Sequence, residues 1–369
     1  MSGLADIIAC ESSICSIENG VLCYRGFSID KLAENASFEE VIYLLWHGRL
    51  PNKIQLDTLR TNLIENAVLP EKIYNLLSLY APWGNCMAKL RTAVSFLTHF
   101  DDNVMDPSPD ADSLKAIRII SKFTAIIAAI DRIRNSLEPV DVTTIQPTSL
   151  AELFLWLLTG EKPSEIATKA LDKCLILHAE HELNASTFAA RVTVSTMSDM
   201  YSGIVSAIGT LKGPLHGNAN EQVANMLEAI GDVDQVEAYI TEKINNKGRI
   251  MGFGHRVYKH GDPRAKHLQK LAHELAEWQQ NTHWYDISIK IAEIVKERKG
   301  LLPNVDFFSA SVYTYIGIPR DMFTLVFALS RSSGWIAHIL EQHANNKLIR
   351  PRAHYIGKRN AVWLPLEDR

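Results

Sequence analysis

Apolar residues recur at helical spacing over long parts of this chain, and this repeat constrains its fold most strongly. Within residues 164–190 the apolar positions fall about one helical turn apart, at Ile166, Ala170, Cys174 and Leu177, and residues 321–340 show the same pattern. Such spacing gathers apolar side chains on one face of a helix. We therefore predict a helix over each of these two segments.

The most hydrophobic long stretch covers residues 188–211, where Arg191 and Asp199 interrupt the apolar run. With these interruptions, no apolar run reaches the roughly 20 residues that a membrane-spanning helix needs. We interpret 188–211 as a buried core helix and expect no membrane partner.

Local signals define two smaller elements. Ser37 stands three residues before Glu40 and ahead of an apolar run, the pattern of a capping box, so a helix should begin there and end near Gly48. Asn19-Gly20 lies between two apolar flanks, which predicts a short β-hairpin over residues 16–24. These signals predict an all-α fold with a small N-terminal hairpin.

Composition limits the classes of function. The 369 residues are 47% hydrophobic and 22% charged, with a formal net charge of -4, which favours a globular chain and argues against a nucleic-acid partner. The opening segment MSGLADIIACESS has no basic lead, so we expect no signal or transit peptide. The five cysteines show no CxxC spacing, so we expect reduced thiols and a cytoplasmic protein.

Three short segments each place a titratable side chain beside glycine or proline. They are KGPLHGN with His216, GFGHR with His255 and PNVDF with Asp306. Each has an ordinary structural alternative, because a histidine beside glycine commonly serves a loop and aspartate commonly caps a helix. Taken singly, these segments do not identify an active site.

The sequence carries partial signals for two other kinds of site. Gly252-x-Gly254 begins a dinucleotide fingerprint, but Val257 interrupts it and no strand precedes it, which excludes a Rossmann site. His178 and Glu182 stand four residues apart and would share a helix face able to hold a divalent ion. The segment is not an HExxH motif, so we favour hydrogen bonding or substrate contact there and expect no metal.

Four motifs occur in a fixed order along the chain: LHGxAN, GFGHRVYKxxDPR, NVDFxSA and SRxxGW. Together they resemble the motifs of the citrate synthase family, and the similarity extends from the N-terminal hairpin to RPRAHYIG near the end of the chain. The resemblance implies that acetyl-CoA, oxaloacetate and water are converted to citrate and CoA, with the CoA thioester as a substrate and no further cofactor. A 2-methylcitrate synthase using propionyl-CoA stays open, because the two substrates differ by one methylene in an apolar pocket.

The resemblance assigns the chemistry to His216, His255 and Asp306. A thioester methyl group is a very weak acid, so removing its proton needs a placed base and a stabilised enolate oxygen. Asp306, between apolar Val305 and Phe307, would be the base, because burial raises the basicity of a carboxylate. His216 would hydrogen-bond the thioester oxygen, and His255 would polarise the ketone of oxaloacetate and protonate its oxygen.

Substrate recognition follows the same resemblance. Oxaloacetate carries two carboxylates, which planar arginine side chains bind better than lysine. The implied oxaloacetate ligands are His181, Arg264, Arg331 and Arg350. The implied contacts of CoA are Arg249, Ile250, Met251, Gly252, Phe253, Gly254 and Lys259.

The resemblance also implies an architecture. Residues 1–217 and 321–369 would form a large helical domain, and residues 218–320 a smaller mobile helical domain in which glycine, proline, histidine and arginine cluster between shorter helices. The protein would be a homodimer in which Arg350 reaches the partner's active site. Two further classes stay open: a metal-dependent hydrolase built on His178 and His181, and a non-catalytic helical scaffold.

Overall fold

The computed structural model describes residues 7–369. Residues 1–6, which begin the segment expected to carry no targeting signal, lie outside the described residues. The strands are β1 (Cys15–Glu18), β2 (Val21–Tyr24) and β3 (Phe27–Ser28). The α-helices are α1 (Ile29–Asn35), α2 (Phe38–His47), α3 (Lys53–Glu65), α4 (Glu71–Ser78), α5 (Cys86–Phe96), α6 (Pro109–Arg134), α7 (Leu150–Thr159), α8 (Glu165–His178), α9 (Ala185–Val194), α10 (Met200–Leu211), α11 (Ala219–Ile230), α12 (Val236–Asn245), α13 (Ala265–Trp278), α14 (His283–Lys299), α15 (Val305–Tyr315) and α16 (Phe323–Ala344). Short 3₁₀ turns are η1 (Leu97–Phe100), η2 (Val142–Thr144), η3 (Val233–Gln235), η4 (Arg320–Met322) and η5 (Leu366–Asp368).

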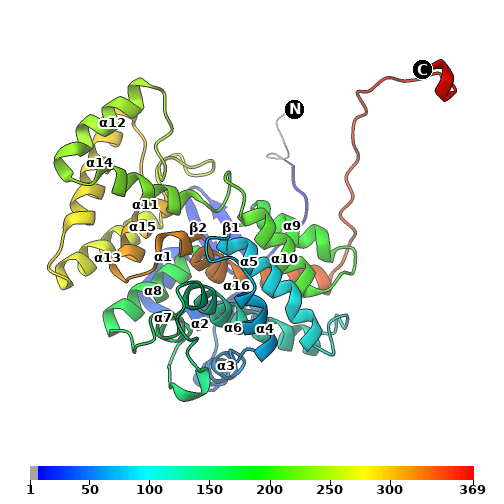
Figure 1. Cartoon of the computed structure of the whole chain (residues 1–369), viewed down its shortest axis with the longest axis horizontal. Helices are drawn as coiled ribbons and strands as arrows, with labels where there is room; N and C mark the ends of the chain where they lie inside the picture. Colours follow the sequence, from blue (N-terminus) through cyan, green and yellow to red (C-terminus); the bar gives the residue numbers. More distant parts are fainter. Residues whose placement is uncertain (1–6) are drawn as a thin grey trace.

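The predicted all-α architecture is confirmed. Helix α16 lies at the centre of the larger group of helices and packs against α2, α5, α6, α8, α9 and α10 (Figure 1). Its side chains are buried on nearly every face from Phe323 to Ile339, as expected of a helix that is enclosed by others. The central helix therefore offers residues to the interior of the molecule on all sides.

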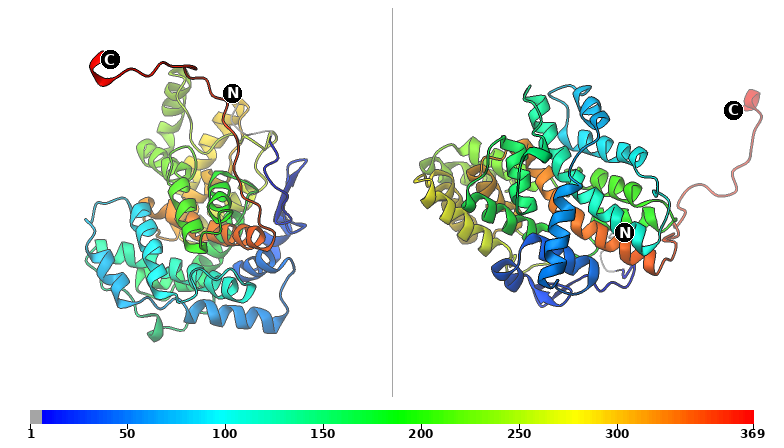
Figure 2. Two further views of the ribbon diagram at one scale, coloured as in Figure 1. Left: turned by 90° about the vertical axis from the view of Figure 1, so that its right-hand side faces the viewer. Right: turned by 90° about the horizontal axis from the view of Figure 1, so that it is seen from below.

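Helices α11 to α15 form a second group beside the first (Figures 1 and 2). They pack mainly against one another, while α13 and α15 also contact α8 of the larger group. This grouping corresponds to the predicted smaller domain of residues 218–320, whose boundaries and mobility remain predictions.

The small sheet has the order β1-β2-β3 and is antiparallel throughout. Asn19 and Gly20 both have positive φ, 51° and 80°, as the two-residue turn of a tight hairpin requires. The predicted hairpin is confirmed, and the third strand, only two residues long, extends it.

Two predicted helix spans are wrong, because a turn interrupts each of them. The segment 164–190 is divided after α8, where Glu182 has a φ of 50° and the side chain of Asn184 caps α9. The segment 188–211 is divided between α9 and α10, where Met197 has a φ of 65° and Asp199 caps α10. Asparagine and aspartate start new helices here by accepting backbone N–H groups that a continuous helix would have satisfied internally.

Other local predictions are confirmed. Helix α2 has the capping box between Ser37 and Glu40, and it ends at Gly48 in the left-handed conformation. The helix predicted over 321–340 begins slightly later, after η4, and continues to Ala344.

The expectation that no apolar run reaches membrane-spanning length is wrong for one helix. Within the described residues, the segment Arg320–Ala344 is long and apolar enough by length and composition, and 94% of its most apolar window is buried inside the protein. All five cysteines lie in the described part of the chain, where they are free.

The C-terminal residues leave the helical body as an extended segment (Figures 1 and 2). From residue 353 to residue 364 every side chain is exposed, including Ile356, Val362 and Trp363. Exposed apolar side chains in such numbers are typical of a surface that another chain covers.

Candidate active site

The turn between α8 and α9 presents His181 to the second group of helices. The Nε2 atom of His181 lies 3.0 Å from the hydroxyl of Tyr258, and its ring centroid lies 5.1 Å from that of His255. Both Tyr258 and His255 come from the loop between α12 and α13. The break that sequence reasoning missed is therefore what places His181 in the site.

The geometry around His255 determines its tautomer. Its Nδ1 accepts hydrogen bonds from the backbone N–H groups of Val257 at 3.0 Å and Tyr258 at 3.3 Å. In the neutral ring the proton then resides on Nε2. His255 can thus donate one hydrogen bond from Nε2 to a substrate oxygen.

Arg264 is buried and engaged by Asp262. The Asp262 carboxylate accepts from Arg264 Nε at 2.9 Å and from Nη2 at 2.8 Å. The remaining nitrogen, Nη1, makes only a 3.5 Å contact with the carbonyl of Leu177. Burial opposes the charge of Arg264, but Asp262 outweighs it and raises the arginine's pKa further above its usual value. One guanidinium nitrogen is therefore available to a ligand.

The same carboxylate ties this arginine to the start of α15. Asp262 Oδ2 accepts the backbone N–H of Val305 at 3.0 Å, next to Asp306. The N-cap of α15 is Asn304, whose side chain accepts the N–H of Asp306, so the alternative of Asp306 as a simple N-cap does not hold. Asp306 occupies the first turn with its carboxylate free of the capping role.

Burial raises the pKa of Asp306 to about 6, against the opposing attraction of Arg264 and Arg331. Its side chain keeps a small exposed fraction, and within residues 7–369 its carboxylate accepts no hydrogen bond from another residue. A carboxylate in this state is a stronger base than an ordinary aspartate.

His216 lies in the loop between α10 and α11 and contacts Ser186 of α9. Its Nε2 accepts the backbone N–H of Ser186 at 3.3 Å and lies 2.8 Å from the Ser186 hydroxyl. That hydroxyl also accepts from Trp335 Nε1 of α16 at 3.1 Å. Because Nε2 accepts from a backbone amide, a neutral His216 carries its proton on Nδ1 and can donate from there.

Arg331 projects from the middle of α16 and is 2% exposed. Its Nε donates to the carbonyl of His178 at 2.8 Å, and its guanidinium stacks over the ring of Phe327 at 4.8 Å. Among the described residues, its two terminal nitrogens have no hydrogen-bond partner. This arrangement leaves a pair of donors for an incoming carboxylate.

The histidines of the site are neutral at physiological pH. Burial, with Arg331 second, lowers the pKa of His216 to about 4. Burial followed by Arg264 lowers the pKa of His255, and the same causes hold that of His181 well below its usual range. Neutral imidazoles can donate hydrogen bonds to a developing oxyanion without competing for the proton of a base.

The predicted CoA loop is bound to the start of α15. Gly252 and Gly254 have positive φ, 81° and 73°, and a Cβ on Gly252 would lie 2.8 Å from Val223 and 2.9 Å from Phe307. The Gly252 carbonyl accepts from Asn304 N at 2.9 Å, and Gly254 N donates to the Leu302 carbonyl at 3.0 Å. Glycine is thus required for the close approach of this loop to α15.

The other predicted CoA contacts lie along the same loop. Ile250 is buried, Met251 and Phe253 are partly buried, and Arg249 and Lys259 are exposed with their charges in solvent. Within residues 7–369, neither the Arg249 nor the Lys259 side chain makes a hydrogen bond or an ion pair.

Among the seven predicted catalytic and oxaloacetate residues, Arg350 is the one that the single chain does not bring to the others. It lies exposed at the base of the extended C-terminal segment. The six remaining residues come from both groups of helices, and the charge of Arg264, of Arg331 or of both acts on each of the other four, His181, His216, His255 and Asp306.

The premise of the metal alternative is wrong. His178 is the last residue of α8 and Glu182 lies beyond the helix with positive φ, so the two do not share a helix face. His178 Nδ1 is already 2.8 Å from the Cys174 carbonyl. Within residues 7–369, no group of three or more His, Cys, Asp or Glu side chains is arranged to hold a metal ion.

Sequence reasoning missed three partners of the site, namely Ser186, Tyr258 and Asp262. Tyr258 and Asp262 stand inside the GFGHRVYKxxDPR motif, close in sequence to His255 and Arg264. This position could have predicted that both residues belong to the site. Ser186 carries no such signal, because its contact with His216 joins residues thirty positions apart.

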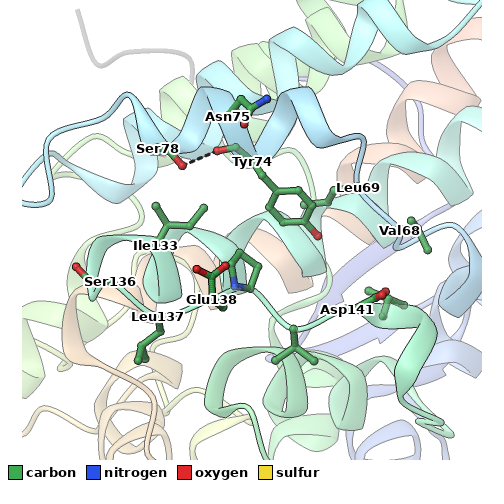
Figure 3. A pocket seen from close by; sticks show the side chains of 13 residues that line it. Val68, Leu69, Tyr74, Asn75, Ser78, Ile133, Ser136, Leu137, Glu138 and Asp141 are labelled. Carbon is green, nitrogen blue, oxygen red and sulfur yellow. Dashed lines mark hydrogen bonds between the residues drawn. The ribbon is translucent and has the colours of Figure 1, made fainter.

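A cavity of about 680 Å³ lies elsewhere in the larger group of helices. It is an open pocket lined by α4, the end of α6 and the segment that follows α6, with Tyr74, Ile133 and Asp141 among its lining residues (Figure 3). None of the predicted site residues lines it. The candidate site is thus defined by converging side chains between the two groups of helices.

Comparisons with known proteins agree with the motifs. Residues 3–352 match the family model described as citrate synthase, C-terminal domain. Citrate synthase 2 of Bacillus subtilis (strain 168) is 52% identical over 100% of this chain and 98% of that protein. The 2-methylcitrate synthase 1 of Corynebacterium glutamicum is 40% identical over 100% of this chain and 98% of that protein.

A solved structure is similar throughout. It is the citrate synthase of the thermophilic archaeon Thermoplasma acidophilum in ternary complex with carboxymethyl coenzyme A and oxaloacetate. Its TM-score is 0.92 at 34% sequence identity, with 100% of this chain and 98% of that chain covered. By family model, sequence and fold, this chain belongs to the citrate synthase family.

Proposed function

We propose that this protein condenses acetyl-CoA with oxaloacetate and water to give citrate and CoA. The observation that carries the proposal is the convergence of a carboxylate of raised pKa, neutral histidines and two buried arginines on one region. This set matches a reaction that needs a base, oxyanion donors and receptors for carboxylates.

In the first step, Asp306 removes a proton from the methyl group of acetyl-CoA. The electron pair of the C–H bond moves to the thioester oxygen, which becomes an enolate. His216 donates a hydrogen bond to this oxygen from Nδ1, because its Nε2 already accepts from Ser186. A neutral donor suits this step, since the enolate is stabilised without being fully protonated.

In the second step, the enolate carbon attacks the ketone carbon of oxaloacetate. His255 polarises the ketone through its Nε2–H and gives this proton to the oxygen as it becomes a hydroxyl. The proton that Asp306 took from the methyl group returns to His255 through water before the next turnover. Water then cleaves the thioester of the citryl-CoA intermediate and releases citrate and CoA. The CoA thioester is a substrate in this scheme, and no other cofactor takes part.

Oxaloacetate is held by His181, Arg264 and Arg331. The free Nη1 of Arg264 and the two free nitrogens of Arg331 are the donors for its carboxylates. Lys259 and Arg249, both exposed, receive the phosphates and the adenine end of CoA together with the backbone of residues 250–254.

The group of helices α11 to α15 acts as the mobile smaller domain, spanning residues 218–320. Because His255 and Arg264 belong to it and Arg331 to the larger domain, oxaloacetate draws the domains together and completes the CoA site. Closure excludes water from the enolate.

The active unit is a homodimer in the cytoplasm. Arg350 lies on a segment that leaves its own chain and exposes apolar side chains such as Ile356 and Trp363, so a second copy is the partner that covers them. Arg350 then supplies a third arginine to the partner's oxaloacetate site. The free cysteines suit a reducing compartment.

A second candidate is 2-methylcitrate synthesis from propionyl-CoA. It is favoured by relatives such as the 2-methylcitrate synthase 1 of Corynebacterium glutamicum at 40% identity. The test is kcat/KM for acetyl-CoA and propionyl-CoA with oxaloacetate, measured as release of the CoA thiol. We expect acetyl-CoA to be preferred; a propionyl-CoA preference would establish the second candidate, and no turnover with either would refute both.

A further inference from the structure

A buried carboxylate lies directly behind the oxaloacetate site. Glu180 precedes His181 in the turn after α8 and is fully buried. Its Oε1 accepts the backbone N–H of His181 at 2.8 Å, while its Oε2 has no hydrogen-bond partner among the described residues. A buried, partly unsatisfied carboxylate costs stability, so its place beside the site calls for an explanation.

Glu180 is approached from α9 and α16 as well. Arg191 of α9 donates to His338 Nδ1 at 2.9 Å. Arginine has no acceptor, so the proton of His338 resides on Nε2. That Nε2 lies 3.3 Å from Glu180 Oε1, close enough for a polar contact but without the geometry of a hydrogen bond. Oε1 therefore receives its one well-formed hydrogen bond from His181.

Helix α16 leaves space for this carboxylate. Gly334 stands one turn after Arg331, and a Cβ at this position would lie 2.1 Å from Glu180 Oε2 and 2.4 Å from the carbonyl of Ala179. The helix that carries Arg331 thus packs directly against the turn that carries His181. Glu180 fills the contact between them.

We propose that Glu180 is a positioning residue for oxaloacetate binding. By accepting the backbone N–H of His181, its carboxylate fixes the turn so that the imidazole meets Tyr258 and faces His255. The essential property is an acceptor oxygen at the reach of a glutamate side chain. This inference rests on the proposed function, because it concerns the binding of oxaloacetate at that same site.

Two substitutions separate reach from charge. Glu180→Asp keeps the charge but withdraws the oxygen by one methylene, and Glu180→Gln keeps the reach and an acceptor oxygen but removes the charge. We expect Glu180→Asp to raise KM for oxaloacetate about tenfold, the cost of one hydrogen bond to a charged group, with a smaller change in kcat. In the Glu180→Gln variant, KM for oxaloacetate should stay within about threefold of the wild-type value.

The chain offers a matched control in Glu39. Glu39 is also fully buried, accepts one backbone N–H, that of Leu150 at 2.7 Å, and has a second oxygen without a hydrogen bond. It lies away from the site, so Glu39→Asp should lower the midpoint of thermal unfolding without changing KM for oxaloacetate.

The outcomes are distinct. Wild-type KM in folded Glu180→Asp, equal damage in Glu180→Gln, or the same rise in KM in Glu39→Asp would each overturn the positioning role. The wild-type protein in the same assay tests the proposed function separately, because its failure to turn over would remove that function whatever the variants do.

Discussion

The buried position of Asp306 makes its carboxylate a stronger base and also lowers the stability of the folded protein. Burial raises its pKa to about 6, although Arg264 and Arg331 lie near enough to oppose the shift. The pKa of Asp306 is higher in the folded protein than in an unfolded chain. The ionised Asp306 carboxylate therefore destabilises the fold at any pH above its folded-state pKa. The neutral form that burial favours is the form that cannot act as a base.

This tension gives a pH prediction. As pH falls through about 6, Asp306 gains a proton, and kcat/KM for acetyl-CoA, which reports on the free enzyme, should fall about tenfold per pH unit below that point. The measurement is kcat/KM for acetyl-CoA from pH 5 to pH 8. A value that stays constant down to pH 5 would contradict the assignment of Asp306 as the base.

Asp306→Asn tests the stability side of the same argument. The variant removes the buried charge, so it should be more stable than the wild type at pH 7.5 by up to about 3 kcal/mol. The difference should narrow at pH 5, where the wild-type carboxylate is largely neutral. Unfolding by denaturant at the two pH values measures it, and a variant less stable at pH 7.5 would show that the ionised carboxylate is stabilised by its surroundings.

The residues inside the motifs could be predicted from sequence, and so could the positions of Tyr258 and Asp262, whereas a partner outside the motifs such as Ser186 could not. His216, His255, Asp306 and Arg331 stand in motifs that, taken together, resemble those of the citrate synthase family. The Nδ1–H of His216, by contrast, depends on Ser186, which lies on α9, thirty residues earlier in the chain. Tautomers and available donors are set by contacts between distant segments, and these appear only in the fold.

At the level of elements, local capping signals competed with helical periodicity. Periodicity alone predicted continuous helices over 164–190 and 188–211, and both are interrupted. Asn184 and Asp199 start new helices there, and their side chains are common N-caps. The capping box at Ser37 could be predicted because the apolar run begins just after the cap. Asn184 and Asp199 have apolar runs on both sides, so the periodicity predicts a helix that continues through them.

Hydrogen bonds join the loop of residues 251–254 to the start of α15. Asn304 bridges them, donating from its backbone to Gly252 and from its side chain to the Gly254 carbonyl at 3.0 Å. A disturbance in the CoA loop should therefore reach Asp306.

Gly252→Ala tests this connection. The new Cβ would meet Val223 and Phe307 within 3 Å at a φ of 81°, which forces the loop away from α15. We expect KM for acetyl-CoA to rise and kcat to fall, each by about tenfold. The control is Gly300→Ala, where φ is 64° but the space around the new Cβ is open. If Gly300→Ala lost as much activity as Gly252→Ala, backbone strain alone would explain the loss in both variants.

For the whole molecule, the helical spacing of apolar residues predicted the all-α architecture, while the smaller domain of residues 218–320 stays a prediction. The arrangement of the two groups around the site leads to an expectation for binding order. Titration calorimetry should show tighter binding of acetyl-CoA, or of a non-reactive analogue, when an oxaloacetate analogue is present. Equal affinity in both conditions would remove the support for closure by oxaloacetate.

The dimer hypothesis is tested by mixing inactive subunits. Homodimers of Asp306→Ala and Arg350→Ala are dissociated, mixed equally and reassociated. If Arg350 serves the partner's site, random pairing makes about half of the dimers mixed, each with one intact site, so about a quarter of all sites recover.

Differential tags on the two variants verify that mixed dimers have formed. With mixed dimers present and no recovery of activity, Arg350 would serve its own chain or no site at all.

The central claim is that Asp306 removes the methyl proton while other residues hold oxaloacetate. The most direct measurement is kcat for condensation, together with oxaloacetate affinity, in the Asp306→Ala variant. The account predicts that kcat falls by about 10³-fold or more, while oxaloacetate binds within about threefold of its wild-type affinity. Near-normal turnover in a correctly folded variant would contradict it.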